Sequence, residues 1–310
     1  MSFNELPFEL HSKIAEYLPL KDRHQLQKCS RDLRAVHDTA PLFFTTGRFM
    51  RFSSHDDDPK FACVYFEDLE LEFHNRDNGT DFERIRVTNN QRVTERTTRF
   101  EGEDYCEVAK RCFRDIFLKK QVSFGLFTTN CVTDETLFES GDQIDVQEII
   151  FFNFETVQNA DQRIDLWLEH MNTKNLKKFI VYNHEVGNCI IGNHSILKNL
   201  ERFTVLLASD VTDELLLSLT ATEICIDHSM ITVEGVNQFI KNWVTRKVEK
   251  GAEFEYSPAD LTSFTLEAAV EGLRNVSFRS NEAIIPIADD RSLHIWIRDQ
   301  CVRVECLRKP

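Results

Sequence analysis

Four similar segments recur in the second half of the chain, and they constrain its fold more than any other feature. They begin at Val146 (VQEIIFFNF), Leu176 (LKKFIVYNH), Leu200 (LERFTVLLA) and Ala221 (ATEICIDHS). Each is short and rich in β-branched and aromatic residues, which is typical of a buried strand. Helical patterns separate them, at residues 161–171, 212–219 and 232–247. A strand plus a helix repeated at this interval predicts an irregular, curved solenoid in which each unit covers the next.

The intervals are close to those of leucine-rich repeats, so the predicted solenoid resembles that class. The Asn position of such repeats is poorly kept here, and we expect the last unit late, near Leu261. In a leucine-rich unit the first, fourth and sixth strand positions point inward. The residues at these positions are Val146, Ile149, Phe151, Leu176, Phe179, Val181, Leu200, Phe203 and Val205.

The neighbours of the inward residues must point outward, because side chains alternate along a strand. These outward-pointing residues form a row across the strands: Glu148, Ile150, Phe152, Lys178, Ile180, Tyr182, Arg202, Thr204 and Leu206. It is unusually apolar for a solvated surface, and aromatic and Arg residues in such a patch are typical of binding hot spots. We therefore predict a substrate-binding surface made of Glu148, Phe152, Lys178, Tyr182 and Arg202. The alternative is that residues 48–104 or the C-terminal strands cover this row and bury it as core.

The rest of the chain is also rich in strand patterns. Residues 48–104 alternate apolar and charged side chains, which predicts short antiparallel strands. From residue 105 the pattern becomes a helix followed by a strand. The segment 292–307 (SLHIWIRDQCVRVECL) alternates again, so we expect one or two final strands that cap the open end of the stack.

The N-terminus shows a different period. Leu6, Leu10, Ile14 and Leu18 recur at every fourth position, which predicts a short amphipathic helix that Pro19 ends. A second stretch at 20–29 and a third that ends before Pro41 continue the apolar stripe. Three helices of this size bury little area alone, so a partner or the rest of the chain should cover part of their apolar surface.

The segment LPFELHSKIAEYLPLKDRHQLQKCSRDLR resembles the F-box, a motif of about 45 residues. The leading Leu-Pro pair, the mid-motif Ile14, the Asp-Arg turn at 22–23 and the Cys-Ser-Arg stretch at 29–31 appear in the family's order, whereas the Trp that many members carry at the end is missing. The alternative is a helical cap that seals a solenoid. The resemblance implies docking of Leu6, Pro7, Leu10, Ile14, Leu18, Leu20, Leu26 and Leu33 into the groove of a Skp-type adaptor, or support of that docking.

A second, looser resemblance lies toward the C-terminus. The stretch VNQFIKNWVTRKVEKGAEFEYSPADLTSFTL and the late strands resemble the F-box-associated region of the expanded nematode F-box families, which is taken to recruit substrates. The expected fold class is α+β to α/β. It comprises an F-box at 1–45, a β-rich connecting segment at 46–104 and a leucine-rich-repeat-like, substrate-binding region at 105–310.

Charge and cysteine use limit the partners and the compartment. The 37 basic and 51 acidic residues give a formal charge of -14, which disfavours nucleic acid and anionic membrane surfaces. Nine Cys are scattered without a CxxC pair and the N-terminus lacks the pattern of a leader, so we expect a reducing compartment, cytoplasmic, nuclear or both. No apolar run is long enough to predict a membrane span.

Signatures of catalysis are missing from the sequence: it has no GxSxG, HExxH or Walker loop. Cys189, between His184 and His194, is the strongest candidate nucleophile, but packing is the simpler interpretation. His55 with 56–58 offers metal ligands in one loop, and the pairs Cys106/Cys112 and Cys301/Cys306 are badly spaced for zinc. We expect no catalytic residue, no metal and no cofactor.

These patterns favour a binding protein over an enzyme. The predicted function is the substrate-recognition subunit of an SCF-type cullin-RING ubiquitin ligase, which docks a Skp-type adaptor, and through it a cullin, with its N-terminal helices and an unknown target with its C-terminal region. One alternative is an F-box scaffold that acts outside a ligase. The other is an enzyme with a cryptic site, which a convergent polar pocket would support.

Overall fold

The computed structural model is α+β, with many strands and few helices. Its chain forms two compact units: unit 1 holds 1–128, 134–147 and 170–172, and unit 2 holds the remainder. No helix in the described part of the chain combines the length and the hydrophobicity of a membrane span. The structure describes residues 7–16, 18, 20–26, 28–39, 42–52, 60–88, 91–118, 122–130, 137–152, 162–172, 174–182, 188–260, 262, 264–288, 290–298 and 301–308.

Three short helices open unit 1: α1 (Phe8–Glu16), α2 (Leu20–Leu26) and α3 (Arg31–Thr39). Ser30 begins the third, because its hydroxyl accepts a hydrogen bond from the backbone N–H of Leu33 at 3.1 Å. Arg23 is buried, and its Nε donates to the carbonyl of Leu18 at 3.2 Å, which ties α2 to the end of α1. The Cys-Ser and Asp-Arg positions of the motif therefore have local structural roles.

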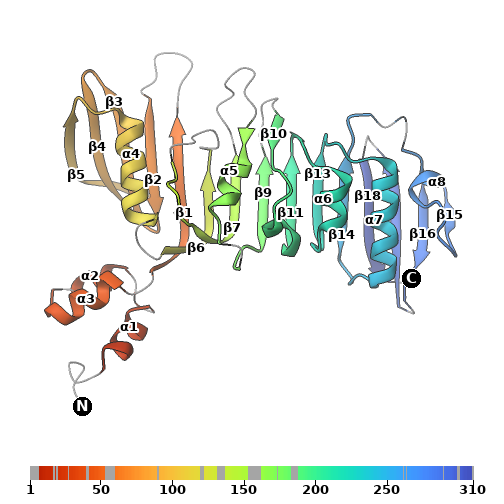
Figure 1. The fold of residues 1–310 in the computed structure, drawn as a ribbon, viewed down its shortest axis with the longest axis horizontal. Helices are drawn as coiled ribbons and strands as arrows, with labels where there is room; N and C mark the ends of the chain where they lie inside the picture. Colours follow the sequence, from red (N-terminus) through yellow and green to blue (C-terminus); the bar gives the residue numbers. More distant parts are fainter. Residues whose placement is uncertain are drawn as a thin grey trace. The chain divides into compact units, whose positions relative to one another are not determined.

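The sheet of unit 1 is an antiparallel meander, as the alternation predicts. Its strands are β1 (Leu42–Phe52), β2 (Phe61–Phe66), β3 (Leu69–Arg76), β4 (Gly79–Thr88) and β5 (Gln91–Glu101), with β6 (Val122–Thr129) beside β1. The helix α4 (Tyr105–Phe113), extended by a π turn (Arg114–Leu118), covers one face (Figure 1). Phe113 stacks on Phe49 at 4.8 Å between ring centroids. Gly47 is required there, since a Cβ would overlap the ring of Phe124.

Unit 2 contains a run of parallel strands, which explains the repeated segments of the sequence. They are β7 (Asp145–Phe152), β9 (Lys178–Tyr182), β11 (Arg202–Leu206), β13 (Glu223–Asp227) and β14 (Glu253–Ser257), paired in this order. Short parallel strands also pair within the connections: β8 (Gln162–Arg163), β10 (Asn188–Ile190) and β12 (Ala208–Ser209). The helical connections α5 (Ile164–Glu169), η3 (Ser195–Asn199), α6 (Asp213–Ser218) and α7 (Val233–Arg246) complete each turn of the chain.

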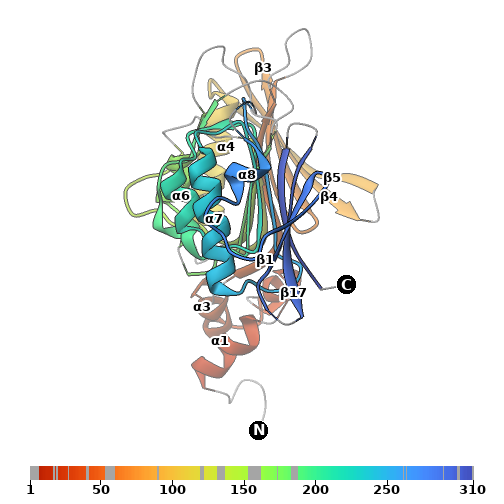
Figure 2. The same cartoon turned by 90° about the vertical axis from the view of Figure 1, so that its right-hand side faces the viewer.

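The core of unit 2 lies between the parallel strands and helices α5, α6 and α7, which Figures 1 and 2 show on one face of the sheet. All nine residues predicted to point inward are buried. Phe151, Phe179 and Phe203 form a ladder across three strands, with ring centroids 5.9 and 5.5 Å apart. The prediction of which positions on these strands point into the core is therefore confirmed.

The position predicted for the last repeated unit is wrong. The fifth parallel strand is β14, with Phe254 and Tyr256 buried, and it precedes Leu261, which lies outside the described residues. The helix α7 is the longest in unit 2, so it displaces the next strand without breaking the repeat. Thr232 caps α7 by accepting from the N–H of Gly235 at 3.1 Å.

Antiparallel strands end the parallel run. After the short α8 (Leu266–Ala269) come β15 (Ser277–Arg279), β16 (Glu282–Pro286), β17 (Arg291–Arg298) and β18 (Cys301–Arg308), paired in sequence order. The last strand, β18, pairs antiparallel with β14. Residues 292–307 thus form two strands that cover the edge of the parallel run, as their alternation predicts.

Candidate functional site

The first candidate surface lies on α1. Leu10 and Ile14 stand one turn apart, and they remain 48% and 36% exposed. Pro7 before them is also exposed. Apolar side chains that a helix leaves in a row on its surface are typical of an interface. We call Pro7, Leu10 and Ile14 the helical surface.

The other residues predicted for adaptor docking fall into two groups. Leu18 and Leu26 are half-buried, whereas Leu33 is buried and supports the helices from within. Leu20 begins α2, and Leu6 lies outside the described residues. The structure therefore brings together a smaller exposed set than the motif contains, because part of the apolar stripe holds the short helices to one another.

The second candidate surface is the face of the unit 2 sheet that points away from α5, α6 and α7 (Figure 2). Strand register places Glu148 opposite Lys178, Phe152 opposite Tyr182, and Arg202 beside Lys178. These five predicted target-binding side chains are half-buried or exposed. We define the outer sheet face as Glu148, Ile150, Phe152, Lys178, Ile180, Tyr182, Arg202, Thr204, Leu206, Glu223, Cys225, Asp227, Glu253, Glu255, Ser257, Cys301, Arg303 and Glu305.

One half of the outer sheet face, on β7, β9 and β11, is apolar. Phe152 and Tyr182 stack with ring centroids 5.8 Å apart, and Leu206 lies next to Tyr182 in register. The row is flanked by an ion pair of Lys178 with Glu148 at 3.4 Å. Thr204 departs from the predicted exposure, since it is buried.

The reason for the burial of Thr204 is its neighbour on the same strand. The Nε of Arg202 donates to the hydroxyl of Thr204 at 3.2 Å, so the Arg202 side chain lies over it. This contact also orients the guanidinium group toward β13, where Nη1 reaches Glu223 at 3.8 Å.

The other half of the outer sheet face, on β13, β14 and β18, is acidic. Glu253 and Glu305 share one guanidinium group, that of Arg303, at 2.8 and 2.5 Å. Within the described residues, Asp227 and Glu255 form no salt bridge. Carboxylates predominate here because β13 and β14 place acidic side chains on alternate positions.

Two thiols of the outer sheet face, Cys225 and Cys301, have raised pKa values. Burial, followed by the charges of Glu255 and Asp227, raises the pKa of Cys225 to about 12. Burial and the Glu255 charge raise the pKa of Cys301 to about 11. Burial is the larger cause of both shifts, and the carboxylates add to it by repelling the thiolate, which is the part that reflects negative charge at the sheet surface.

The acidic half was missed by reasoning from the sequence, which followed the outward row only as far as β11. A signal was present in the alternation Glu-Ile-Cys-Ile-Asp at 223–227 and Glu-Phe-Glu-Tyr-Ser at 253–257. Both segments place apolar side chains at the buried positions, and most of the alternate, outward positions are acidic. Extending the period-two argument to these strands identifies the carboxylates.

Comparison with known families matches two segments of this chain. Residues 3–42 match the family described as F-box domain, and residues 193–250 match the family described as F-box associated. The chain is an F-box protein. Its pairing of domains is that of the nematode type, as the two resemblances predict. No curated protein and no solved structure matches the chain.

Each family match overlaps one of the two candidate surfaces. The F-box match contains the helical surface, and F-boxes in general bind Skp-type adaptors for substrate recognition by SCF ligases. The F-box associated match contains β11 and β13, which form the centre of the outer sheet face. An F-box associated region suggests a domain that binds target proteins.

Cys189 of this F-box protein is placed unfavourably for a nucleophile. The thiol is buried, and burial together with the charge of Asp210 raises its pKa. His184 lies outside the described residues, and His194 precedes η3. The carboxylate of Asp210 also accepts hydrogen bonds from the N–H groups of 191 and 192, at 2.7 and 3.1 Å.

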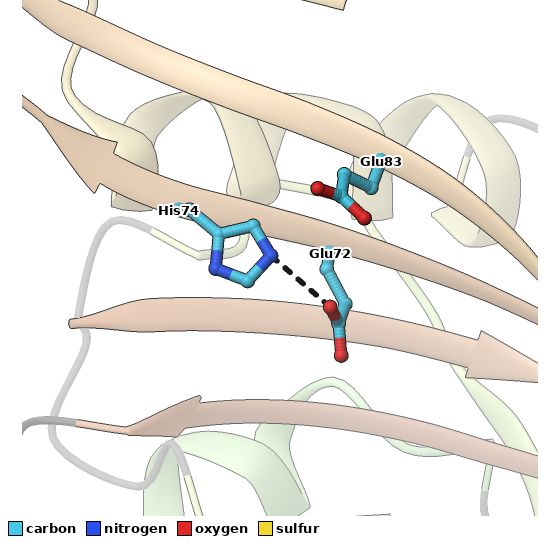
Figure 3. Close-up of side chains that lie close together, drawn as sticks. All are labelled: Glu72, His74 and Glu83. Atoms are coloured by element: carbon cyan, nitrogen blue, oxygen red, sulfur yellow. Dashed lines mark hydrogen bonds and ion pairs between the residues drawn. The ribbon is translucent and has the colours of Figure 1, made fainter. Parts of the chain in front are cut away.

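Among the described residues, one cluster has metal-ligand chemistry that the sequence analysis did not predict. Glu72 and His74 on β3 lie beside Glu83 on β4, with one ligand atom of each within 4.8 Å of the others (Figure 3). The Nε2 of His74 lies 3.0 Å from Oε2 of Glu72, and Arg92 Nη2 lies 2.5 Å from its Oε1. An imidazole and two carboxylates suit a divalent ion. Arg92 already supplies a positive charge to Glu72, so an ion-pair network explains the contacts.

The remaining candidates from the sequence do not form a site. The loop with His55 and 56–58 lies outside the described residues. Cys301 lies on the outer sheet face whereas Cys306 is buried, which confirms that they point to opposite sides of β18. Cys106 and Cys112 occupy α4, and burial raises the pKa of both thiols.

Proposed function

We propose that this F-box protein is the substrate-recognition subunit of an SCF-type cullin-RING ubiquitin ligase. The three N-terminal helices dock the adaptor, which links the chain to a cullin, and the leucine-rich-repeat-like region of 105–310 captures a target protein. Both contacts take place in the cytoplasm or the nucleus. The adaptor contacts are Leu6, Pro7, Leu10, Ile14, Leu18, Leu20, Leu26 and Leu33, and the target contacts are Glu148, Phe152, Lys178, Tyr182 and Arg202.

One observation carries the proposal: among the described residues, α1 and the strands β7, β9 and β11 each present apolar side chains at the surface. The helical surface falls in the F-box match, and the outer sheet face overlaps the F-box associated match at β11 and β13. A protein that recruits one partner to another needs two such surfaces, each with an apolar centre. The stacked pair Phe152 and Tyr182 is an aromatic anchor of the kind that dominates binding energy.

The mechanism needs no acid, base or nucleophile from this chain. Holding a target lysine near a ubiquitin carrier raises the effective concentration of the reacting groups, and orientation alone removes a large part of the barrier. A rigid sheet suits this role, because small shifts of a positioned group reduce the rate steeply. The buried phenylalanine ladder under the outer sheet face provides that rigidity.

The test is a reconstituted ligase. Proximity labelling with the full chain and with a chain that lacks 1–45 identifies candidate targets, which are then purified. We expect ubiquitination of the purified target with adaptor, cullin and full chain, and none when 1–45 is absent. Target capture by the truncated chain should persist, since the outer sheet face lies in unit 2.

The same assay separates the ligase from its alternatives. A target that binds adaptor-bound chain but is never ubiquitinated indicates an F-box scaffold that acts outside a ligase. Turnover of the target by the isolated chain, lost in Cys189→Ser with binding retained, indicates an enzyme. Either result contradicts the proposal.

A further inference from the structure

The outer sheet face has two halves of different chemistry, and this division limits what can bind there. The half on β7, β9 and β11 presents the stacked pair Phe152 and Tyr182 together with Leu206, which is 38% exposed. The half on β13, β14 and β18 presents carboxylates. A partner that covers both must offer apolar side chains to one half and compensate charge on the other.

The acidic half has more carboxylates than cations. Its outward acidic residues are Glu223, Asp227, Glu253, Glu255 and Glu305, against one basic residue, Arg303. Arg303 is shared by two of them, and Arg202 from β11 reaches a third at 3.8 Å. Among the described residues Asp227 and Glu255 form no salt bridge, although Glu255 lies opposite Arg303 in register. Five carboxylates against one guanidinium group leave a net negative charge that a cation from a partner can compensate.

The basic residues of this face are already engaged. Lys178 lies 3.4 Å from Glu148, and Arg202 contacts both Thr204 and Glu223. Recognition of a phosphate group needs several free cationic or N–H donors that converge on one point. The outer sheet face offers carboxylates in that position, so a phosphorylated segment would be repelled.

The strand spacing gives the reach of a bound segment. Neighbouring strands lie about 4.8 Å apart, so β9 and β14 are separated by roughly 14 Å. An extended peptide advances about 3.3 Å per residue, so it covers this distance in about four residues. In register, Tyr182 aligns with Leu206 on β11, and the same row continues to Asp227 on β13 and Ser257 on β14, with Glu255 two residues away along β14. An apolar anchor on Tyr182 therefore places a side chain over Asp227 about three residues away and over Glu255 about five residues away.

We propose that the outer sheet face recognises an extended target segment that carries an apolar or aromatic residue and, about three to five residues away, Lys or Arg. The apolar residue packs on Phe152 and Tyr182. The cation pairs with Asp227 and Glu255. Recognition does not require phosphorylation. This inference rests on the proposed function and specifies the class of target.

The test uses labelled synthetic peptides of about twelve residues and the full chain bound to a Skp-type adaptor. The basic peptide carries Leu and Tyr in one half and Lys and Arg in the other, and a second version reverses the order of the halves. Matched peptides replace the basic residues with Glu, or with phosphoserine. By fluorescence anisotropy, we expect one basic order to bind about tenfold or more tighter than both matched peptides, and to weaken at high salt.

Variants of the chain locate the binding. Asp227→Asn with Glu255→Gln should weaken the basic peptide about fivefold or more. The matched control Glu214→Gln with Glu234→Gln removes the same charge from the helix side, on α6 and α7, and should leave binding within about twofold. If both double variants lose the same peptide affinity, the peptide is attracted by the net charge of the chain, and the inference is overturned. Tighter binding of the phosphoserine peptide, or no binding of either basic peptide, would also overturn it.

Capture of the purified target separates this inference from the function on which it rests. Loss of capture in Phe152→Ala with Tyr182→Ala, but not in the Asp227 and Glu255 pair, keeps the proposed function and overturns the basic specificity. Capture that survives both pairs of changes overturns the outer sheet face as the target site. Loss in both pairs supports the inference.

Discussion

The helical surface and the outer sheet face expose similar side chains on very different supports. Leu10 and Ile14 stand on an α1 of nine residues, and the buried apolar side chains described in these helices are few: Ala15, Leu33 and Val36. Phe152 and Tyr182 stand on strands whose other side carries buried aromatic rings. The difference shows that the exposure of apolar residues does not by itself indicate how rigidly the underlying structure supports a surface. A surface on short helices gains stability from its partner, whereas a surface on a packed sheet is formed beforehand.

The largest effect should come from removing the support of the sheet. Phe203→Ala deletes a ring that is fully buried and stacks on Phe179, so we expect the free energy of unfolding to fall by about 3–5 kcal/mol. Denaturant unfolding measures it. Leu206→Ala on the same strand is the control, and its partly exposed side chain should cost about 1 kcal/mol or less. Similar losses in the two variants would mean that the outer sheet face is core.

The next effect concerns the helical surface. Leu10→Ala with Ile14→Ala should weaken adaptor binding by about 2 kcal/mol or more, because central apolar anchors carry most of an interface's energy. Titration calorimetry with the purified adaptor measures it. Val93→Ala, an exposed apolar residue of β5, is the matched control and should bind normally. Unchanged binding in the double variant, with its helices intact, would contradict the docking of the adaptor on this surface.

Removing one helix cap from each region sharpens the comparison. Ser30→Ala and Thr232→Ala each delete a hydroxyl that accepts a backbone N–H, at 3.1 Å in both cases, and each should cost about 1 kcal/mol. Ser30→Ala should weaken binding of the adaptor, because part of the binding free energy is then needed to order α3. Thr232→Ala should leave adaptor binding unchanged. Calorimetry that finds equal adaptor affinities for the two variants would refute the idea that the helices need their partner.

The smallest effect tests the negative potential on the sheet. Because the pKa of Cys225 is raised to about 12, its thiol is protonated at neutral pH, and its alkylation should accelerate about tenfold per pH unit as the pH rises toward 12. Glu255→Gln removes the largest charge effect on this thiol, so its pKa should fall and alkylation at pH 8 should become about two- to tenfold faster. Mass spectrometry of the alkylated peptide measures the rate. The helix-side variant Glu214→Gln should react like the native chain, and an unchanged rate in Glu255→Gln would remove this support for an acidic half.

Sequence reasoning succeeded where a local rule sets the structure. The parity of Phe179 and Phe203 follows from alternation along one strand, and the motif around Ile14 has fixed spacings. The confirmed inward row is a consequence of the first rule, and the F-box match of the second. These two rules account for the fold of the strands and for the family.

The failures concern relations between elements. The Glu72, His74 and Glu83 cluster depends on the register of β3 and β4, which the hairpin turn at 77–78 sets. No periodicity within one strand reveals such a register. The shift of the last parallel strand to β14 depends on the length of α7, and the burial of Thr204 on the direction of a neighbouring guanidinium group.

The central claim is that the outer sheet face captures a target independently of the helical surface. Phe152→Ala with Tyr182→Ala tests it most directly, measured as target capture, adaptor binding and denaturant unfolding on one preparation. We predict that target capture is lost while adaptor binding persists and the free energy of unfolding stays within about 0.5 kcal/mol, as for ordinary surface changes. A double variant that unfolds, or one that is stable and still captures the target, would contradict the claim.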